Sequence, residues 1–572
     1  MENDILEFKD MGFQYRAQAK PTLYNIDFKV KRGEKILIAG PSGCGKSTVA
    51  SLINGLIPFS YKGQISGSVL VGNKETRDMS LFEISRVVGT VLQDSDAQFV
   101  GMTVAEDIAF ALENDCVPQE EMKDRVVKIA DTLGLKDVLR HAPTELSGGQ
   151  KQRVSVGGVM IGDVSLFLFD EPLANLDPKT GKQTIELIDE LHQKTGAAVI
   201  IIEHRIEDVL HRYVDRVVLM NEGHIISDTT PDELLSSKQL IECGVREPLY
   251  LTALKYAGVS ISPQMKPSDI SSLLLSDAEK DKVRSFYVQN NNTKKEAPRQ
   301  DLLTVKNLSF TYEKSSKKTL RNISVDIKKG EMVAIVGTNG AGKSTFSKVI
   351  CGMEKEDEGE IIFDGIEFKT LSIKERAQHV GYVMQDPNQM ISKVMIYDEV
   401  ALGLRLRGFS EEEVKTKVEE ALKICGLYKM RNWPISALSY GQKKRVTICS
   451  ILVLEPEMLI LDEPTAGQDY RNYTSIMEFL RKLNERGITI VMITHDMHLM
   501  LEYVDRSIVF SDGEIIADKS CAQVLTDKAI VDRASLKETS LYTLAEICGI
   551  TDGTGFVQNF IDYERENVRG HE

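Results

Sequence analysis

The same phosphate-binding pattern is written twice in this chain of 572 residues. Residues 40–47 (GPSGCGKS) and 337–344 (GTNGAGKS) each contain glycines followed by a lysine and a hydroxyl residue, as does a loop whose backbone N–H groups hold phosphate oxygens. Later pieces recur in the same order: 297 residues separate Lys46 from Lys343, and 292 separate Asp170 from Asp462. The chain therefore consists of two similar halves with the same expected fold.

Apolar runs predict the buried strands of that fold. In each half one run precedes the phosphate loop, a second ends at the acidic pair Asp170-Glu171 or Asp462-Glu463, and a third ends at His204 or His495. Such runs are typical of parallel strands buried on both faces, and their alternation with helices predicts an α/β core with a mostly parallel sheet. The six runs are 35–39, 166–169, 198–202, 332–336, 458–461 and 488–493.

Small helical appendages follow both cores. Leu249-Tyr250 and Leu541-Tyr542 recur 292 residues apart, so we expect a helical segment as part of each repeating unit, although chance similarity between two leucine-rich tails is the alternative. A polar stretch around residues 289–298 predicts a linker. We expect an ATPase domain over 1–230, its appendage over 231–288, a linker over 289–300, a second ATPase domain over 301–522 and a second appendage over 523–572.

Composition excludes several classes of function. The formal net charge of −15 and a pI near 5.3 lack the broad basic footprint of a nucleic-acid partner. We find neither an apolar stretch of about 18 residues for a membrane span nor a leader at the amino terminus, so we expect a chain that neither crosses a bilayer nor is exported. The eight cysteines are scattered singly, as in a protein of a reducing cytosol.

The motifs can support phosphoryl chemistry. Lys46 and Lys343 can reach the β and γ phosphates, and the hydroxyls of Ser47 and Ser344 can ligate Mg²⁺. A phosphate loop alone would also suit a small-molecule kinase. Asp170 and Asp462 can hold Mg²⁺ directly or through water, while the adjacent Glu171 and Glu463 can polarise a water molecule for attack on the γ phosphate.

Two strings before the acidic pairs are the most diagnostic. Residues 146–153 (LSGGQKQR) and 438–445 (LSYGQKKR) resemble the signature motif of ATP-binding-cassette (ABC) ATPases. With them the resemblance covers nearly all of both halves. It implies two P-loop NTPase domains, each with a RecA-like core, a helical subdomain and a β subdomain.

The resemblance also implies roles for single residues. Glu171, Glu463, His204, His495 and the Q-loop residues Gln93 and Gln385 would be catalytic, residues 174–177 would be a D-loop, and Mg²⁺ would be held by Ser47, Gln93, Asp170, Ser344, Gln385 and Asp462. The residues expected to bind ATP are Tyr15, Gly40, Pro41, Ser42, Gly43, Cys44, Gly45, Lys46, Ser47, Thr48, Ser147, Gly148, Gly149 and Gln150 in the first half, and Tyr312, Gly337, Thr338, Asn339, Gly340, Ala341, Gly342, Lys343, Ser344, Thr345, Ser439, Tyr440, Gly441 and Gln442 in the second.

In this family the signature serves the nucleotide of another domain. The resemblance implies a head-to-tail sandwich of the two halves of one chain, with one ATP between Lys46 and Ser439 and the other between Lys343 and Ser147. The halves are not identical, since Tyr440 stands where the pattern has glycine and residues 466–469 (AGQD) replace the D-loop ANLD. We favour hydrolysis at both sites over a degenerate first site.

Finer details resemble the ATPases of energy-coupling-factor (ECF) importers, which take up vitamins and metal ions. They are residues 93–100 (QDSDAQFV), 169–178 (FDEPLANLDP), 203–205 (EHR) and 438–445, the last similar to fused members connected with thiamine or its hydroxymethylpyrimidine precursor. The resemblance implies a transmembrane coupling subunit, a membrane substrate-binding subunit and a peripheral place on the cytoplasmic side of the cell membrane. The alternative is a tandem cassette translation factor acting on ribosomes, which the acidic composition and short linker disfavour.

Overall fold

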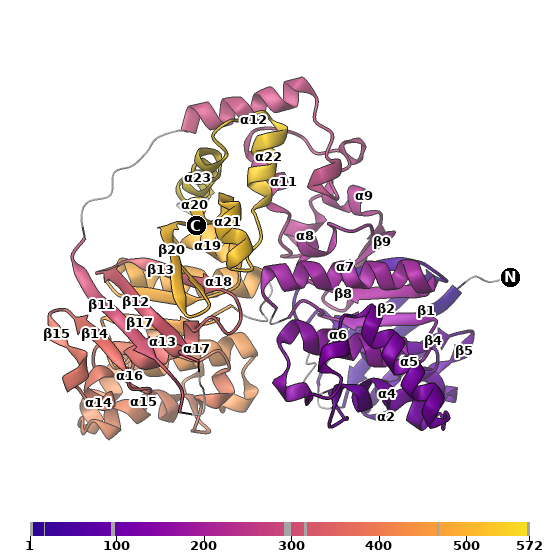
Figure 1. Cartoon of the computed structure of the whole chain (residues 1–572), viewed down its shortest axis with the longest axis horizontal. Helices are drawn as coiled ribbons and strands as arrows, with labels where there is room; N and C mark the ends of the chain where they lie inside the picture. The colour runs from indigo at the N-terminus through magenta and orange to yellow at the C-terminus, as the bar shows by residue number, and fades with distance from the viewer. Residues whose placement is uncertain are drawn as a thin grey trace. The chain divides into compact units, whose positions relative to one another are not determined.

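The computed structural model describes residues 4–16, 18–92, 98–174, 176–290, 299–313, 317–465, 468 and 470–568, apart from the side chains of 289, 290, 567 and 568. The chain divides into two compact units, one of residues 1–176 and 180–282 and the other of residues 177–179 and 283–572. In Figure 1 the colour follows the chain from indigo in the first unit to yellow at the end of the second. The division confirms the expectation of two similar α/β halves, because each unit holds the same two sheets.

The larger sheet of each unit has six strands and is mostly parallel. Its order is β10-β9-β3-β8-β7-β6 in the first unit and β20-β19-β13-β18-β17-β16 in the second, so every strand has a counterpart. Only the edge strands β10 and β20 run antiparallel to their neighbours. The first-unit strands are β3 Lys35–Ala39, β6 Val88–Val91, β7 Leu166–Asp170, β8 Ala198–Ile202, β9 Arg216–Asn221 and β10 His224–Thr229. Their counterparts are β13 Met332–Gly337, β16 Val380–Val383, β17 Met458–Asp462, β18 Thr489–Ile493, β19 Arg506–Ser511 and β20 Glu514–Ser520.

A four-stranded antiparallel sheet completes each core. The orders are β2-β1-β4-β5 and β12-β11-β14-β15. Strands β2 and β12 alternate buried and exposed residues, as expected when one face packs on a core and the other meets water. The strands are β1 Asp4–Tyr15, β2 Leu23–Lys31, β4 Gly63–Val71, β5 Lys74–Glu75, β11 Asp301–Phe310, β12 Leu320–Lys328, β14 Glu358–Phe363 and β15 Ile366–Glu367.

The phosphate-loop helix lies between the two sheets. In the first unit Val49 and Ile53 of α1 (Lys46–Ile53) join one buried cluster with Phe8 of β1 and Ile200 of β8. In the second unit α13 (Lys343–Ile350) contributes Phe346 and Val349 to the equivalent cluster. Because both sheets bury apolar side chains against this helix, the start of the helix is held firmly at the carboxyl end of β3 or β13.

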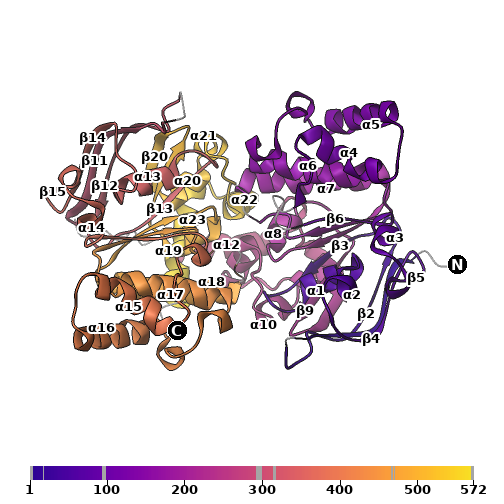
Figure 2. The ribbon, with the colours of Figure 1, turned by 90° about the horizontal axis from the view of Figure 1, so that it is seen from below.

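The helices between β6 and β7, and those between β16 and β17, form a separate group in each unit, seen in Figure 2 as α4, α5 and α6 and as α15, α16 and α17. The first group is α4 Val104–Asn114, α5 Gln119–Thr132 and α6 Gly148–Met160, preceded by α2 Leu56–Phe59 and α3 Leu81–Ser85. The second is α15 Ile396–Leu406, α16 Glu411–Ile424 and α17 Tyr440–Leu452, preceded by α14 Ile373–Arg376. Further helices, α7 Pro178–Thr195, α8 Ile206–Val209, α18 Tyr470–Glu485 and α19 Met497–Tyr503, connect the core strands.

Both predicted appendages are helical. The first has α9 Pro231–Leu235, α10 Gln239–Glu242, α11 Leu249–Tyr256 and α12 Asp277–Asn290, and the second has α20 Cys521–Thr526, α21 Lys528–Arg533, α22 Ser540–Ile547 and α23 Gly553–Tyr563. From Val283 onward α12 belongs to the second unit. There Arg284 Nε donates to the carbonyl oxygen of Cys548 at 2.7 Å, and the Tyr287 hydroxyl donates to Asp552 at 3.0 Å.

Among the described residues, none of the helices combines the length and the apolar character that crossing a membrane requires.

Candidate functional site

The two phosphate loops have the same geometry. Each connects a buried strand to a helix, and its glycines take positive φ, with 109° at Gly45 and 100° at Gly342. The Lys46 ammonium donates to the carbonyl oxygens of Gly40 and Pro41 at 2.7 and 2.9 Å. Lys343 makes the same pair of bonds to Gly337 and Thr338, both 2.8 Å long. Both lysines therefore lie across their own loop, and burial lowers the pKa of Lys343 to about 8.

Both tyrosines expected to bind ATP contact the phosphate-loop helix. The hydroxyl of Tyr15 lies 3.1 Å from Thr48 Oγ1, and the hydroxyl of Tyr312 lies 3.2 Å from Thr345 Oγ1. Tyr15 is the last residue of β1 and Tyr312 follows β11, so each tyrosine connects the end of an antiparallel strand to α1 or α13. The structure thus brings these tyrosines, the lysines and the loop hydroxyls together in each unit.

In the first unit the acidic pair ends β7. Asp170 accepts a hydrogen bond from Ser47, and burial raises the pKa of Asp170 to about 6 against the opposing effect of Lys46. Its Oδ1 is buried and has no hydrogen-bond partner in the described part of the chain. A buried carboxylate oxygen next to a serine hydroxyl fits Mg²⁺, which favours oxygen ligands. Burial also raises the pKa of the neighbouring Glu171 carboxyl.

In the second unit the acidic pair ends β17 and has different neighbours. Asp462 Oδ2 accepts a hydrogen bond of 3.0 Å from the hydroxyl of Tyr382 in β16, where the first unit has Thr90. Glu463 Oε1 lies 3.5 Å from His495 Nε2. Burial, reinforced by Asp462, raises the pKa of Glu463 to about 8. His495, which the resemblance implies is catalytic, thus lies beside the glutamate to which it assigns the same role.

Glu203, which stands in the string 203–205 but was given no role of its own there, holds the loop of the first predicted catalytic histidine, His204. Glu203 is completely buried, and its Oε2 accepts the backbone N–H groups of His204 at 2.8 Å and Arg205 at 3.1 Å. Its Oε1 accepts the N–H of Leu173 at 3.2 Å. Glu203 therefore fixes the loop of His204 against the loop of the acidic pair. The second unit has Thr494 before its histidine, so no sequence repeat pointed to this role.

The signature serines cap their helices. Ser147 Oγ accepts the backbone N–H of Gln150 at 3.4 Å at the start of α6, and Ser439 Oγ accepts that of Gln442 at 3.3 Å at the start of α17. Gly148, Gly149, Tyr440 and Gly441 form the first turns. Both serines are exposed, and helix starts of this kind offer N–H groups to an anion.

The loops after β6 and β16 are only partly described. Gln93 with residues 94–97, and Asn175 in the first D-loop, lie outside the described residues, as do Ala466, Gly467 and Asp469 in the second. The backbone oxygen of Gln385 accepts a bond of 3.3 Å from the Tyr440 hydroxyl. Tyr440 is thus in contact with the second Q-loop, which the sequence did not suggest.

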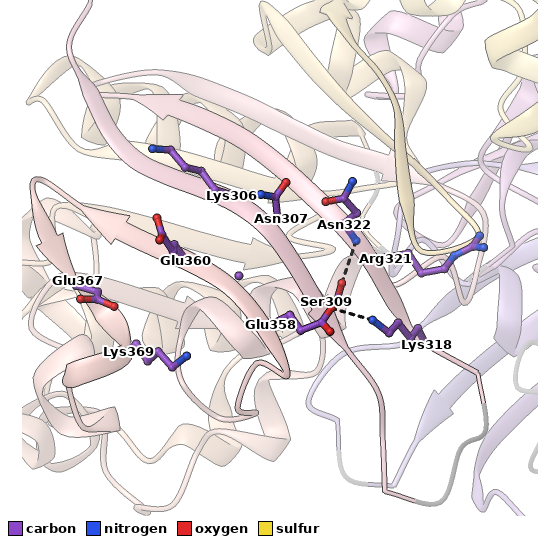
Figure 3. A pocket seen from close by; sticks show the side chains of 11 residues that line it. Lys306, Asn307, Ser309, Lys318, Arg321, Asn322, Glu358, Glu360, Glu367 and Lys369 are labelled. Carbon is purple, nitrogen blue, oxygen red and sulfur yellow. Dashed lines mark hydrogen bonds and ion pairs between the residues drawn. The ribbon is translucent and has the colours of Figure 1, made fainter.

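A charged hollow of about 890 Å³ lies away from these motifs, on the antiparallel sheet of the second unit (Figure 3). Its lining includes Lys318, which pairs with Glu358 at 2.9 Å, and Ser309, which accepts the N–H of Asn322 at 3.2 Å. No phosphate-loop, signature or acidic-pair residue lines it. The hollow is therefore no part of the candidate nucleotide site.

The raised pKa of Glu463 predicts how stability depends on pH. Between the ordinary value of 4.5 and about 8, the folded chain keeps a proton on Glu463 that the unfolded chain has lost, so the free energy of unfolding falls as pH rises, by up to about 1.4 kcal/mol per pH unit from this group. We expect Glu463→Gln to remove this dependence on pH. The free energy of unfolding of the variant, relative to that of the native chain, should therefore rise from pH 5 to pH 8.

Urea unfolding without nucleotide measures this effect. Trp433, the chain's one tryptophan, lies in the second unit, so its fluorescence follows the unit that contains Glu463. Glu420→Gln, at an exposed position of α16, is the matched control, and its free energy of unfolding should change with pH as that of the native chain does. The same pH dependence in Glu463→Gln would contradict the expectation.

Together the fold and these sites define a nucleotide-binding protein with two phosphate-loop cassettes. A family model described as "ABC transporter" matches residues 23–174 and 320–466, and a model described as "ATP-binding cassette cobalt transporter" matches residues 237–310. The chain is 58% identical over 561 residues to a putative ABC transporter ATP-binding protein of Clostridium perfringens, covering 98% of both chains. A protein of the same description from Enterococcus faecalis is 54% identical, with 99% of both chains covered. The chain belongs to the ABC transporter family of ATP-binding proteins, whose cassettes are ATPases.

Solved structures of single cassettes resemble parts of the chain. The structure of cbiO1 from Clostridium perfringens, described as part of the ABC transporter complex cbiONQ, is 34% identical, with a TM-score of 0.39, and covers 43% of this chain and 99% of its own. A dimeric ATP-binding cassette, MJ0796, bound to ADP and phosphate, is 32% identical, with a TM-score of 0.36, and covers 38% of this chain and 99% of its own.

Proposed function

We propose that this tandem ATPase energises an ECF-type importer of a vitamin or other micronutrient. The observation that supports this most is the match of residues 237–310 to a model described as "ATP-binding cassette cobalt transporter", next to the family match over both cassettes. The chain would act as a peripheral protein on the cytoplasmic face of the cell membrane, with a transmembrane coupling subunit and a membrane substrate-binding subunit.

The cassettes would work as an ATP-driven clamp. One Mg²⁺–ATP would be bound between Lys46 and Ser439 and the other between Lys343 and Ser147, with both halves supplied by one chain, because a fused pair has a high effective concentration. Ser47 with Asp170, and Ser344 with Asp462, would hold Mg²⁺, with Gln93 and Gln385 as further ligands; the metal would neutralise charge on the phosphates. In their deprotonated forms Glu171 and Glu463 would each accept a proton from the attacking water, and His204 and His495 would orient that water.

A repeated pair of exposed apolar side chains supports docking onto a membrane subunit. Leu81 and Ile373, at equivalent positions of α3 and α14, are 42% and 56% exposed. Met102 and Val394, just before α4 and α15, are 83% and 74% exposed. Apolar groups exposed at the same two places in both halves indicate a surface that meets an apolar partner.

The cargo would be chosen by the substrate-binding subunit. The resemblance of residues 438–445 to fused ECF ATPases favours thiamine or hydroxymethylpyrimidine, whereas the description of the model matching residues 237–310 names cobalt. Uptake assays with co-expressed membrane subunits separate the two. The names of the relatives favour transport over the ribosome alternative, and cell fractionation would show membrane rather than polysome association.

If these apolar side chains contact the coupling subunit, charges introduced at their positions should weaken the complex with that subunit. We expect Met102→Glu with Val394→Glu to lower recovery of the co-expressed coupling subunit about tenfold, since about 1.4 kcal/mol of binding free energy corresponds to that factor. Charge reversal at Asp94 and Asp386 should act in the same direction, but Asp386 also accepts the N–H of Asn388 at 2.9 Å, so the apolar pair is the cleaner test. Ile226→Glu, at another exposed position, is the control. Undiminished recovery would contradict the docking surface.

A further inference from the structure

A lysine is buried behind the acidic pair of the second unit. Lys444 lies in α17, five residues after the capping Ser439, and is only 1% exposed. Its ammonium donates to the backbone carbonyl oxygen of Glu463 at 2.9 Å. Burial lowers the pKa of Lys444 to about 8, against the opposing effect of the nearby acidic groups of Glu463, Asp462 and Asp386. A fully buried cation is costly unless it is bonded and near negative charge, and this position supplies both.

The first unit has a neutral residue at the equivalent position. Gln152 of α6 is 8% exposed, and its side-chain amide donates to the carbonyl oxygen of Pro172 at 2.7 Å. Both signature helices thus contact the loop that follows the acidic pair. Of these two contacts, the one in the second unit comes from a lysine and ends on the glutamate itself, whereas the one in the first unit comes from an amide and ends on the proline after the glutamate.

The backbone at Glu463 explains why such a contact matters. Glu463 has a φ of 46°, a left-handed conformation that is strained for residues other than glycine. Its N–H donates to the carbonyl oxygen of Ile493 at 2.9 Å, and its carbonyl accepts Lys444. Both backbone polar groups of the strained residue are therefore held, and the direction in which its side chain leaves the backbone is fixed with them.

We propose that Lys444 is a positioning residue of the second ATP site, which holds Glu463 through its backbone and places a lysine where the first unit has the neutral Gln152. This rests on the proposed role of Glu463. Because α17 also carries Ser439, assigned above to the ATP of the other site, Lys444 connects the signature that senses one nucleotide to the glutamate that acts on the other. The two sites consequently differ in their hydrolysis step.

Three substitutions of Lys444 in the full-length chain separate the effect of its charge from that of its hydrogen bond. Lys444→Gln introduces the residue that the first unit has at this position, Lys444→Met removes both the hydrogen-bond donor and the charge, and Lys444→Arg keeps both. We expect the Gln and Met variants to lower kcat for ATP about tenfold, a change of about 1.4 kcal/mol in transition-state stabilisation, with KM changed less than about twofold. The Arg variant should retain most of the native kcat. Gln152→Met is the matched control for packing at the signature helix and should lower kcat less than Lys444→Met does.

Two outcomes overturn the proposal. A Lys444→Met chain with native kcat and native unfolding midpoint shows that Lys444 does not position the site, and equal losses of kcat and unfolding midpoint in the Met, Gln and Arg variants show a merely structural role. Glu463→Gln is measured alongside. If Lys444 acts through Glu463, adding Lys444→Gln to Glu463→Gln causes no further loss, whereas a Glu463→Gln chain with the native rate refutes the proposed role of Glu463 itself.

Discussion

Replacing Glu171 and Glu463 together with glutamine is expected to slow ATP hydrolysis by at least about 10²-fold, because a positioned general base contributes about 10²- to 10⁴-fold. ATP should still bind, since the phosphate-loop contacts of Lys46 and Lys343 are unchanged. Steady-state phosphate release measures the rate, and ATP-dependent protection from unfolding measures binding. Glu420→Gln, at an exposed position, is the control and should retain the native rate.

The single substitutions then decide whether the sites are equal. Two working sites predict that Glu171→Gln and Glu463→Gln each reduce the rate. If one leaves hydrolysis untouched and the other abolishes it, equality of the sites is wrong. A double variant that retains the native rate would refute the assignment of both glutamates.

The second large effect is expected at a glycine of the second phosphate loop. Gly337 has a φ of 138°, and a Cβ there would collide with the carbonyl oxygen of Phe510 in β19. We expect Gly337→Ala to lower the free energy of unfolding of the second unit by about 3 kcal/mol, combining backbone strain with overpacking. Urea unfolding followed by Trp433 fluorescence measures the loss.

Gly340 provides a control in the same loop. Its φ is 78°, but a Cβ there would meet nothing within 4 Å, so Gly340→Ala should cost only the backbone strain of about 1 kcal/mol. Equal losses in the two variants would show that the collision with Phe510 is relieved at no cost.

The core strands were predictable because their sequence signal is local. The runs 35–39 and 198–202 match β3 and β8 residue for residue, and the run 166–169 ends one residue before β7 does. Strands buried on both faces need unbroken apolar runs, and each run here ends at a motif. The loops were predictable for the same reason, since glycines with positive φ stand at fixed spacing before a lysine.

Contacts between distant segments were not predictable. Lys444 and Glu463 belong to a helix and a strand end whose packing no motif encodes. The same holds for the hydrogen bond from Tyr382 to Asp462 and for the hydrogen bond that Glu203 accepts from the backbone of His204. In each case the counterpart in the other half is a different residue, so the internal repeat, which carried the sequence argument, gave no signal there.

The residues alone were enough to predict two α/β cassettes, the places of their phosphate loops and acidic pairs, and the resemblance to ABC ATPases. Apolar periodicity and the backbone requirements of glycine are local properties, and the duplication doubles their signal. Which side chains surround each acidic pair, and how burial changes their pKa values, became clear from the folded chain, because desolvation depends on neighbours from several segments. The folded chain thereby showed that two sites built from the same motifs have different electrostatic surroundings.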